Sequence, residues 1–185
     1  QAKIKMMRIT PAKEKVEIRN YRIGRIVDER IDKSNIGYLS TGAHNYFLQA
    51  QFKQSLPEEF SSFLNESVQQ SPQAEELELH VYDYLLFEKS SFKGAEIAVS
   101  SHYALFNKAG HRLVDYSMVD TRNTGMFMSA NAGELLNRNL VNYLKEMDNK
   151  INPFLAMYKD NKPIKVSYIF VKDPAQKNLL PYIPQ

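Results

Sequence analysis

The chain has 185 residues and contains no cysteine. It therefore has no disulfide, no thiol nucleophile, and no thiolate for a zinc site or an iron–sulfur cluster. It also lacks an uninterrupted apolar run of about 18 residues, so we expect no transmembrane helix. Its 24 lysines and arginines only slightly outnumber its 21 aspartates and glutamates, for a formal net charge of +3. Because this bias is weak, we expect no nucleic-acid partner.

The common catalytic motifs are missing as well. The chain has no glycine-rich phosphate loop, no H-E-x-x-H zinc motif and no G-x-S-x-G nucleophile elbow. Its four histidines, His44, His80, His102 and His111, are scattered over expected strands and loops. His102 and His111 would share a metal across a hairpin only if they lay opposite each other, and the expected register does not place them so. We therefore expect solvated histidines, no metal site and no cofactor.

Hydrophobic residues make up 43% of the chain and charged residues 24%, which is the composition of an ordinary soluble globular protein. The length suits one domain, and we predict a single domain over residues 1–185. Its core is expected over residues 16–171. Residues 172–185 contain three prolines and are predicted to form an irregular tail.

The first half of the chain predicts extended segments and one helix. Residues 16–31 are predicted to be extended, with a bulge or bend near Gly24 where the alternation changes phase. Residues 36–42 include two glycines and are predicted to be a loop, followed by a short strand over Tyr46–Phe52. A serine and a glutamate at capping-box spacing, Ser55 and Glu58, then predict a helix that ends at 69–72.

The second half predicts a three-stranded meander over residues 77–88, 96–106 and 111–121. The connection at 107–111 suits a three-residue hairpin loop with Gly110 in the left-handed conformation. The resulting register pairs Leu105 with Leu113 and Val99 with Val119.

A second capping box, Asn131 with Glu134, predicts the start of a longer helix, which we expect to end at Pro153. A last strand is expected over 163–171. This order of elements predicts an α+β fold, with a mainly antiparallel sheet and two helices packed on one face.

The densest acidic cluster is the run from Asp28 to Asp32. Two of its carboxylates would serve as acid and base if a cleft held them, but nothing nearby supplies a nucleophile. We favour a structural role, in which Asp28 binds backbone N–H groups of the loop and Arg30 pairs with a carboxylate on an adjacent strand. The run Tyr82-Asp83-Tyr84 offers stacking surfaces, although no basic stripe accompanies it.

We expect the segment from Asp28 to Gly42 to lie at one edge of the sheet and to contribute to a recognition surface. Binding residues tend to sit on loops that a rigid sheet carries, and aromatic side chains supply much of the binding energy. The candidate binding residues are Asp28, Arg30, Tyr38, Thr41, His44 and Tyr46. The alternative is that Tyr38 and Tyr46 only cover the end of the core.

The segment 26–37, which reads I-V-D-E-R-I-D-K-S-N-I-G, resembles small bacterial envelope lipoproteins. These include the auxiliary lipoproteins of ABC-type lipid transporters, and the same order of elements extends from Val16 to Ile151. The resemblance implies an α+β sandwich similar to the N-terminal domain of the periplasmic protein TolB. It also implies a non-enzymatic envelope protein that binds a protein partner or a lipid, and it carries over no catalytic residues.

The chain departs from this family because it has no lipidated cysteine. Either the sequence begins beyond that cysteine, or this relative is secreted into the periplasm; residues after Pro153 also have no counterpart. We expect a periplasmic or outer-membrane-associated protein whose leader has been removed before Gln1. The alternatives are an intracellular interaction module, trimmed at its start, and an enzyme with an unrecognised cleft.

Overall fold

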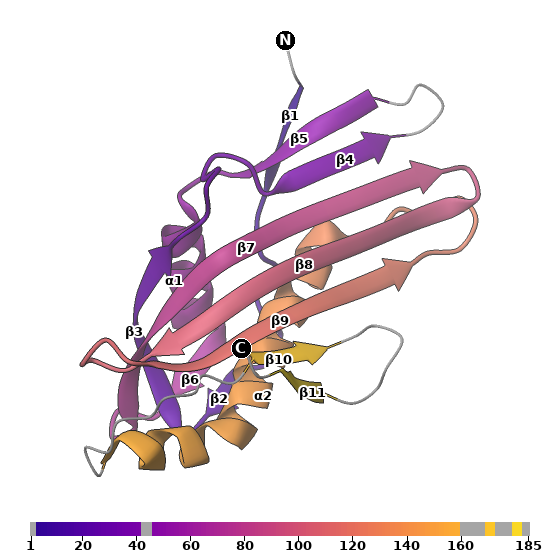
Figure 1. Cartoon of the computed structure of the whole chain (residues 1–185). Coiled ribbons are helices and arrows are strands. Elements are labelled where there is room, and N and C mark those ends of the chain that lie inside the picture. Colours follow the sequence, from indigo (N-terminus) through magenta and orange to yellow (C-terminus); the bar gives the residue numbers. More distant parts are fainter. Residues whose placement is uncertain (1–2, 42–45, 160–168, 173–178, 183–185) are drawn as a thin grey trace.

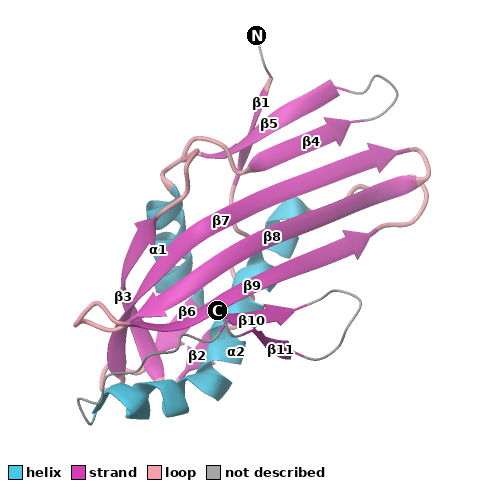
Figure 2. Cartoon of the chain, in the orientation of Figure 1, coloured by secondary structure: helices cyan, strands magenta, loops and turns pink. Residues whose placement is uncertain are grey.

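The computed structural model describes residues 3–41, 46–159, 169–172 and 179–182. Figure 2 shows its helices and strands. In chain order they are β1 (Ile4–Met7), β2 (Val16–Ile18), β3 (Tyr21–Asp28), β4 (Gly37–Thr41), β5 (Tyr46–Phe52), α1 (Leu56–Ser67), β6 (Val68–Gln70), β7 (Glu75–Ser91), β8 (Gly94–Phe106), β9 (Arg112–Asn123), α2 (Ala132–Lys159), β10 (Ile169–Lys172) and β11 (Leu179–Tyr182).

One large sheet dominates the molecule. Its strand order is β1-β5-β4-β7-β8-β9-β10-β11, and β3 pairs with β7 beside this path. The two longest pairings, β7 with β8 and β8 with β9, are antiparallel. Both helices lie behind the sheet in the view of Figure 1. The predicted α+β class, with a mainly antiparallel sheet and two helices on one face, is confirmed.

The core lies between this sheet and the helices. Alternate residues of β7 and β8, such as Leu79, Leu86 and Val99, are fully buried against the helices. Leu136 and Leu140 belong to the apolar stripe of α2 and are equally buried. Burial of apolar surface by both layers is the main source of stability in such a fold.

Helix α1 begins as the sequence predicts. Ser55 accepts a hydrogen bond from the backbone N–H of Glu58, whose carboxylate accepts from the backbone N–H of Ser55. The helix ends at Ser67, and Val68 opens the short strand β6. Strand β6 pairs in parallel with β2 in a separate two-stranded sheet, which the sequence did not predict.

The extended segment predicted over 16–31 consists of two strands in two different sheets. Between β2 and β3 the chain turns at Arg19 and Asn20, whose backbone N–H groups both donate to the carboxylate of Asp148 on α2. That contact spans more than 100 residues of sequence, so local alternation did not reveal it. The predicted bulge is confirmed, because the register of β3 on β7 shifts between Ile23 and Arg25.

The segment predicted as a loop over 36–42 includes strand β4, which lies between β5 and β7. Its first residue, Gly37, has a φ of 142°, and the backbone of Leu86 approaches it so closely that a side chain would collide. The glycine that indicated a loop therefore permits close strand contact instead.

The hairpin between β8 and β9 has the predicted loop, with Gly110 at a φ of 86°. The predicted register holds only next to the loop, where Phe106 pairs with Arg112. A bulge follows, so Leu105 pairs with Val114 and Val99 pairs with Asp120. Because one extra residue enters β9 at the bulge, the predicted pairs with Leu113 and Val119 are wrong by one position.

Helix α2 begins at the predicted cap, where Asn131 accepts from the backbone N–H of Glu134. It continues through Pro153, where the sequence predicted its end. The last turns lie at an angle to the first ones in Figure 1, as expected for a helix with an internal proline. Phe154 and Tyr158 pack against the core beyond the proline, which explains why the helix persists.

Two short strands are described in the C-terminal region. Strand β10 overlaps the predicted last strand at residues 169–171 and extends to Lys172, whereas residues 163–168 fall outside the described residues. Strand β11 forms within the tail predicted to be irregular and pairs with β10. Pro181 is accommodated because β11 is the edge strand, where a residue without an N–H group is tolerated.

Candidate functional site

The face of the sheet that points away from both helices, called here the open face, carries the candidate site. Strand pairing places Ile4, Gln49, Tyr38 and Phe87 side by side across β1, β5, β4 and β7. Cross-strand neighbours point to the same face of a sheet. Because the next residue of β7, Glu88, and its neighbour Leu39 are buried on the helix side, this row lies on the open face.

Six large apolar side chains are exposed on the open face, between 44% and 60% of their surface each. They form a patch, called here the apolar patch, made of Ile4, Met6, Tyr38, Phe47, Leu85 and Phe87. Single exposed apolar residues are common, but a contiguous group of this kind marks an interaction surface. The patch spans β1, β5, β4 and β7, which are adjacent strands.

Two shallow hollows flank the apolar patch. One, of about 290 Å³, lies beside Phe87 and is lined by Lys89, Glu96 and Thr121 among others. The other, of about 300 Å³, lies where the loop after β3 meets Leu85 of β7 and includes the fully exposed Ile31. Both are open depressions at the lower limit of small-ligand pockets. They suit single side chains of a larger partner.

Asp28 and Arg30 hold the loop after β3 in place. The Arg30 guanidinium forms two hydrogen bonds of 2.9 Å with the Asp28 carboxylate and donates to the carbonyl oxygens of Lys33 and Asn35. Asp28 also accepts from the backbone N–H of Arg30, as the favoured structural role predicts. The carboxylate partner of Arg30 is Asp28 itself rather than a residue on an adjacent strand. Both side chains are buried, so their contacts stabilise the loop. Arg30 also lines the hollow beside Leu85, and the predicted binding role of both residues stays a prediction.

The structure places Tyr38 in the apolar patch, beside Phe87. Thr41 and Tyr46 end β4 and begin β5, where they pair with each other, but their side chains lie outside the described part. His44 lies outside the described residues altogether. The predicted role of these three residues stays a prediction.

Polar clusters occupy the open face at the other end of β7. His80 lies 3.0 Å from a carboxylate oxygen of Glu29 and 3.1 Å from one of Glu78. Nε2 of His102 lies 3.1 Å from Oδ1 of Asp115, and the same carboxylate forms an ion pair with Arg112. Within the described ranges no group of three or more such side chains could hold a metal ion. These clusters join neighbouring strands, and they place polar residues beside the apolar patch.

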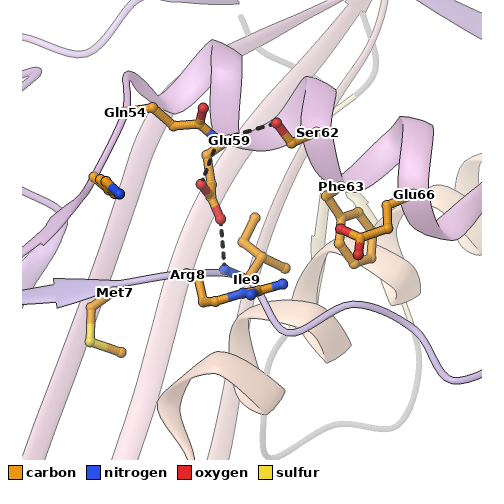
Figure 3. Close-up of a pocket in the computed structure, with 9 residues that line it drawn as sticks. Met7, Arg8, Ile9, Gln54, Glu59, Ser62, Phe63 and Glu66 are labelled. Carbon is orange, nitrogen blue, oxygen red and sulfur yellow. Dashed lines mark hydrogen bonds between the residues drawn. The ribbon is translucent and has the colours of Figure 1, made fainter.

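A hollow of about 450 Å³ lies between α1 and the chain that follows β1 (Figure 3). Its central carboxylate, Glu59, accepts hydrogen bonds of 2.9 Å from the backbone N–H of Ile9 and 2.8 Å from Gln54. Arg8 and Glu66 line the same hollow. Because Glu59 accepts a hydrogen bond from the backbone of Ile9, its contact holds the chain after β1 against α1.

Sequence reasoning identified only Tyr38 of the apolar patch. Leu85 and Phe87 alternate with buried residues along β7. The available signal was a run of apolar residues, which places apolar side chains on both faces of the strand. Ile4 and Met6 alternate in β1, a strand that was not predicted. The assembly of these residues into one patch depends on parallel pairings between segments far apart in sequence.

No family model and no curated protein matches the chain. Among solved structures, an uncharacterized protein is similar, with a TM-score of 0.43 and 7% identity, over 82% of this chain and 100% of its own. A Xanthomonas campestris protein of the DUF330 family is similar with a TM-score of 0.45 and 9% identity, over 86% of this chain and 97% of its own. Likenesses of this degree assign neither a family nor a function. No helix within the described residues is long and apolar enough to cross a membrane.

Proposed function

We propose that this chain is a non-enzymatic protein of the bacterial cell envelope that binds a protein partner through the apolar patch. The single observation that carries the proposal is the exposure of Tyr38, Phe87 and their apolar neighbours on the open face. Burial of such side chains in a partner removes apolar surface from water and supplies binding energy.

The shape of the open face favours a protein over a small molecule. Its hollows, about 290 and 300 Å³, are open and lie at the edges of the patch, whereas small-molecule sites enclose most of their ligand. A broad apolar surface with a polar surround is typical of protein interfaces. The envelope location rests on the resemblance of residues 26–37 to envelope lipoproteins.

The proposal is tested by affinity capture from an envelope extract of the organism that carries the gene. The bait proteins are the wild type, the double variant Tyr38→Ser with Phe87→Ser, and a control, Lys145→Ser with Asn149→Ser. The first double variant removes two exposed apolar side chains. The control positions are exposed residues of α2, outside the apolar patch.

We expect the Tyr38/Phe87 variant to recover its specific protein partner at least about tenfold less well than the wild type, because central aromatic residues dominate interface energies. The control should recover it at the wild-type level. Equal recovery by the wild type and the Tyr38/Phe87 variant, with both folded by circular dichroism, would exclude the apolar patch as the binding surface.

A further inference from the structure

One end of the sheet exposes a second apolar group, separate from the apolar patch. It consists of Phe92 in the turn between β7 and β8, and Met126, Phe127 and Met128 in the loop after β9. Between 62% and 82% of each side chain is exposed. Figure 1 shows the turn and the loop next to each other at the end of the longest strands. These four residues are called here the tip.

Hydrogen bonds hold the loop of the tip against the turn. The backbone N–H of Phe127 donates to the carbonyl oxygen of Phe92 over 3.2 Å. Thr124 exchanges two bonds with the backbone of Ala95, through its own N–H and through its hydroxyl, and the hydroxyl also donates to the carbonyl of Met128. The tip is therefore an ordered part of the fold, and these hydrogen bonds fix its shape in the absence of a partner.

Phe127 combines an unusual backbone conformation with an exposed ring. Its φ is 60°, in the left-handed region that a bulky residue rarely adopts. Such a conformation costs free energy and persists only where the surrounding structure imposes it, often at functional positions. Here it accompanies an aromatic side chain that is 82% exposed.

The charge around the tip is positive in excess. Lys89 and Lys93 flank Phe92 and are exposed. Glu96 is the cross-strand neighbour of Lys89, and Arg122 pairs with Glu134 at 2.9 Å. The three cations Lys89, Lys93 and Arg122 outnumber these two exposed acids, so the tip has a net positive rim that attracts an anionic surface.

We propose that the tip inserts into an anionic lipid surface, with its phenylalanine and methionine side chains among the acyl chains and with Lys89 and Lys93 at the headgroups. The tip stands at the end of the longest strands (Figure 1), a position from which it can reach a lipid layer. Aromatic and aliphatic side chains with a basic surround are the composition of segments that lie in a membrane interface. This site is independent of the apolar patch and of a protein partner.

The chain contains no tryptophan, so a single one reports its own position. The test uses Phe127→Trp, with Ile31→Trp as the matched control at a fully exposed site in the loop between β3 and β4. Both are titrated with vesicles of phosphatidylcholine alone and of phosphatidylcholine with phosphatidylglycerol. We expect Phe127→Trp emission to shift to shorter wavelength with the anionic vesicles and to be quenched by lipids that carry a quencher on the acyl chain. Ile31→Trp emission should not change.

The lysines are tested in the Phe127→Trp background with Lys89→Gln and Lys93→Gln together. Each lysine near an anionic surface contributes roughly a fivefold gain in binding, so the double change should weaken binding to the anionic vesicles by more than about tenfold. Soluble glycerol phosphate should leave the emission unchanged, which separates a lipid surface from a free phosphate.

Unchanged Phe127→Trp emission with anionic vesicles would overturn the proposal, and so would an equal shift of Ile31→Trp. The vesicle assay contains no protein partner, so its failure leaves the proposed function of the apolar patch unaffected. Capture by the apolar patch can likewise fail while vesicle binding holds.

Discussion

At the scale of single residues, two glycines with positive φ show how the surrounding atoms determine the free-energy cost of adding a side chain. A Cβ on Gly37 would collide with the carbonyl oxygen of Leu86, whereas a Cβ on Gly110 meets nothing within 4 Å. We expect Gly37→Ala to lower the free energy of unfolding by more than about 2 kcal/mol, because β4 must move away from β7. Gly110→Ala should cost only about 1 kcal/mol from backbone strain. Urea unfolding of both variants checks this order, and equal losses would contradict it.

A second residue-scale prediction concerns Glu88, which is buried on the helix side of β7 between Leu39 and Ile97. Burial raises the pKa of Glu88 above its ordinary value of 4.5, and the nearby charge of Lys5 opposes this only in part. The folded protein therefore binds the proton more tightly than the unfolded chain does. The resulting stabilisation is fully present below pH 4.5 and is lost as the pH rises through the folded pKa.

Glu88→Gln removes this titration while keeping the shape of the side chain. Between acidic and neutral pH, we expect the variant to gain free energy of unfolding relative to the wild type. The difference between the two should be larger at pH 7 than below the ordinary glutamate pKa. Chemical denaturation across this range measures it, and a difference that does not change with pH would show that Glu88 titrates normally.

The role of a residue was predictable from the sequence where its hydrogen-bond partner lies a few positions away in the chain. The bond from the Arg30 N–H to Asp28 spans two residues, and the cap of α1 spans three. The carboxylate of Asp148, which binds the turn between β2 and β3, has its partner more than 100 residues away. Nothing in the local sequence indicates such a contact.

At the scale of elements, the stripe of α2 makes the clearest prediction. Leu140 is fully buried against the sheet. We expect Leu140→Ala to lower the free energy of unfolding by about 2–5 kcal/mol, because it removes apolar contacts and leaves a cavity. Thermal or urea unfolding measures the loss. A loss below about 0.5 kcal/mol, which is usual at exposed positions, would mean that this face of α2 is not in the core.

Elements with strong local signals were predictable, and elements made by tertiary contact were not. The cap of α1 and the loop with Gly110 follow from local chemistry, and both are present. The register beyond Phe106 was missed because one bulge residue shifts every later pair. The continuation of α2 past Pro153 depends on packing of the residues after it, and periodicity before the proline contains no information about that packing.

At the scale of the whole molecule, the fold class followed from the order of elements, but the open face did not. The apolar patch exists because β4 lies between β5 and β7, and because β1 pairs in parallel with β5. Parallel pairing joins segments that are distant in sequence, so no hairpin rule predicts it. The molecule thus has one buried face, covered by α1 and α2, and one face with exposed apolar side chains.

The proposed function requires that the open face, rather than the helix side, contacts a partner protein. The most direct measurement is site-specific photo-cross-linking in the cells that carry the gene, with a photoreactive phenylalanine analogue in place of Tyr38 or, as the control, in place of Ser61, an exposed residue of α1. We expect a discrete cross-linked protein from the Tyr38 position and none from the Ser61 position. A cross-link from Ser61 alone, or none from Tyr38 in a folded and expressed protein, would contradict the proposed function.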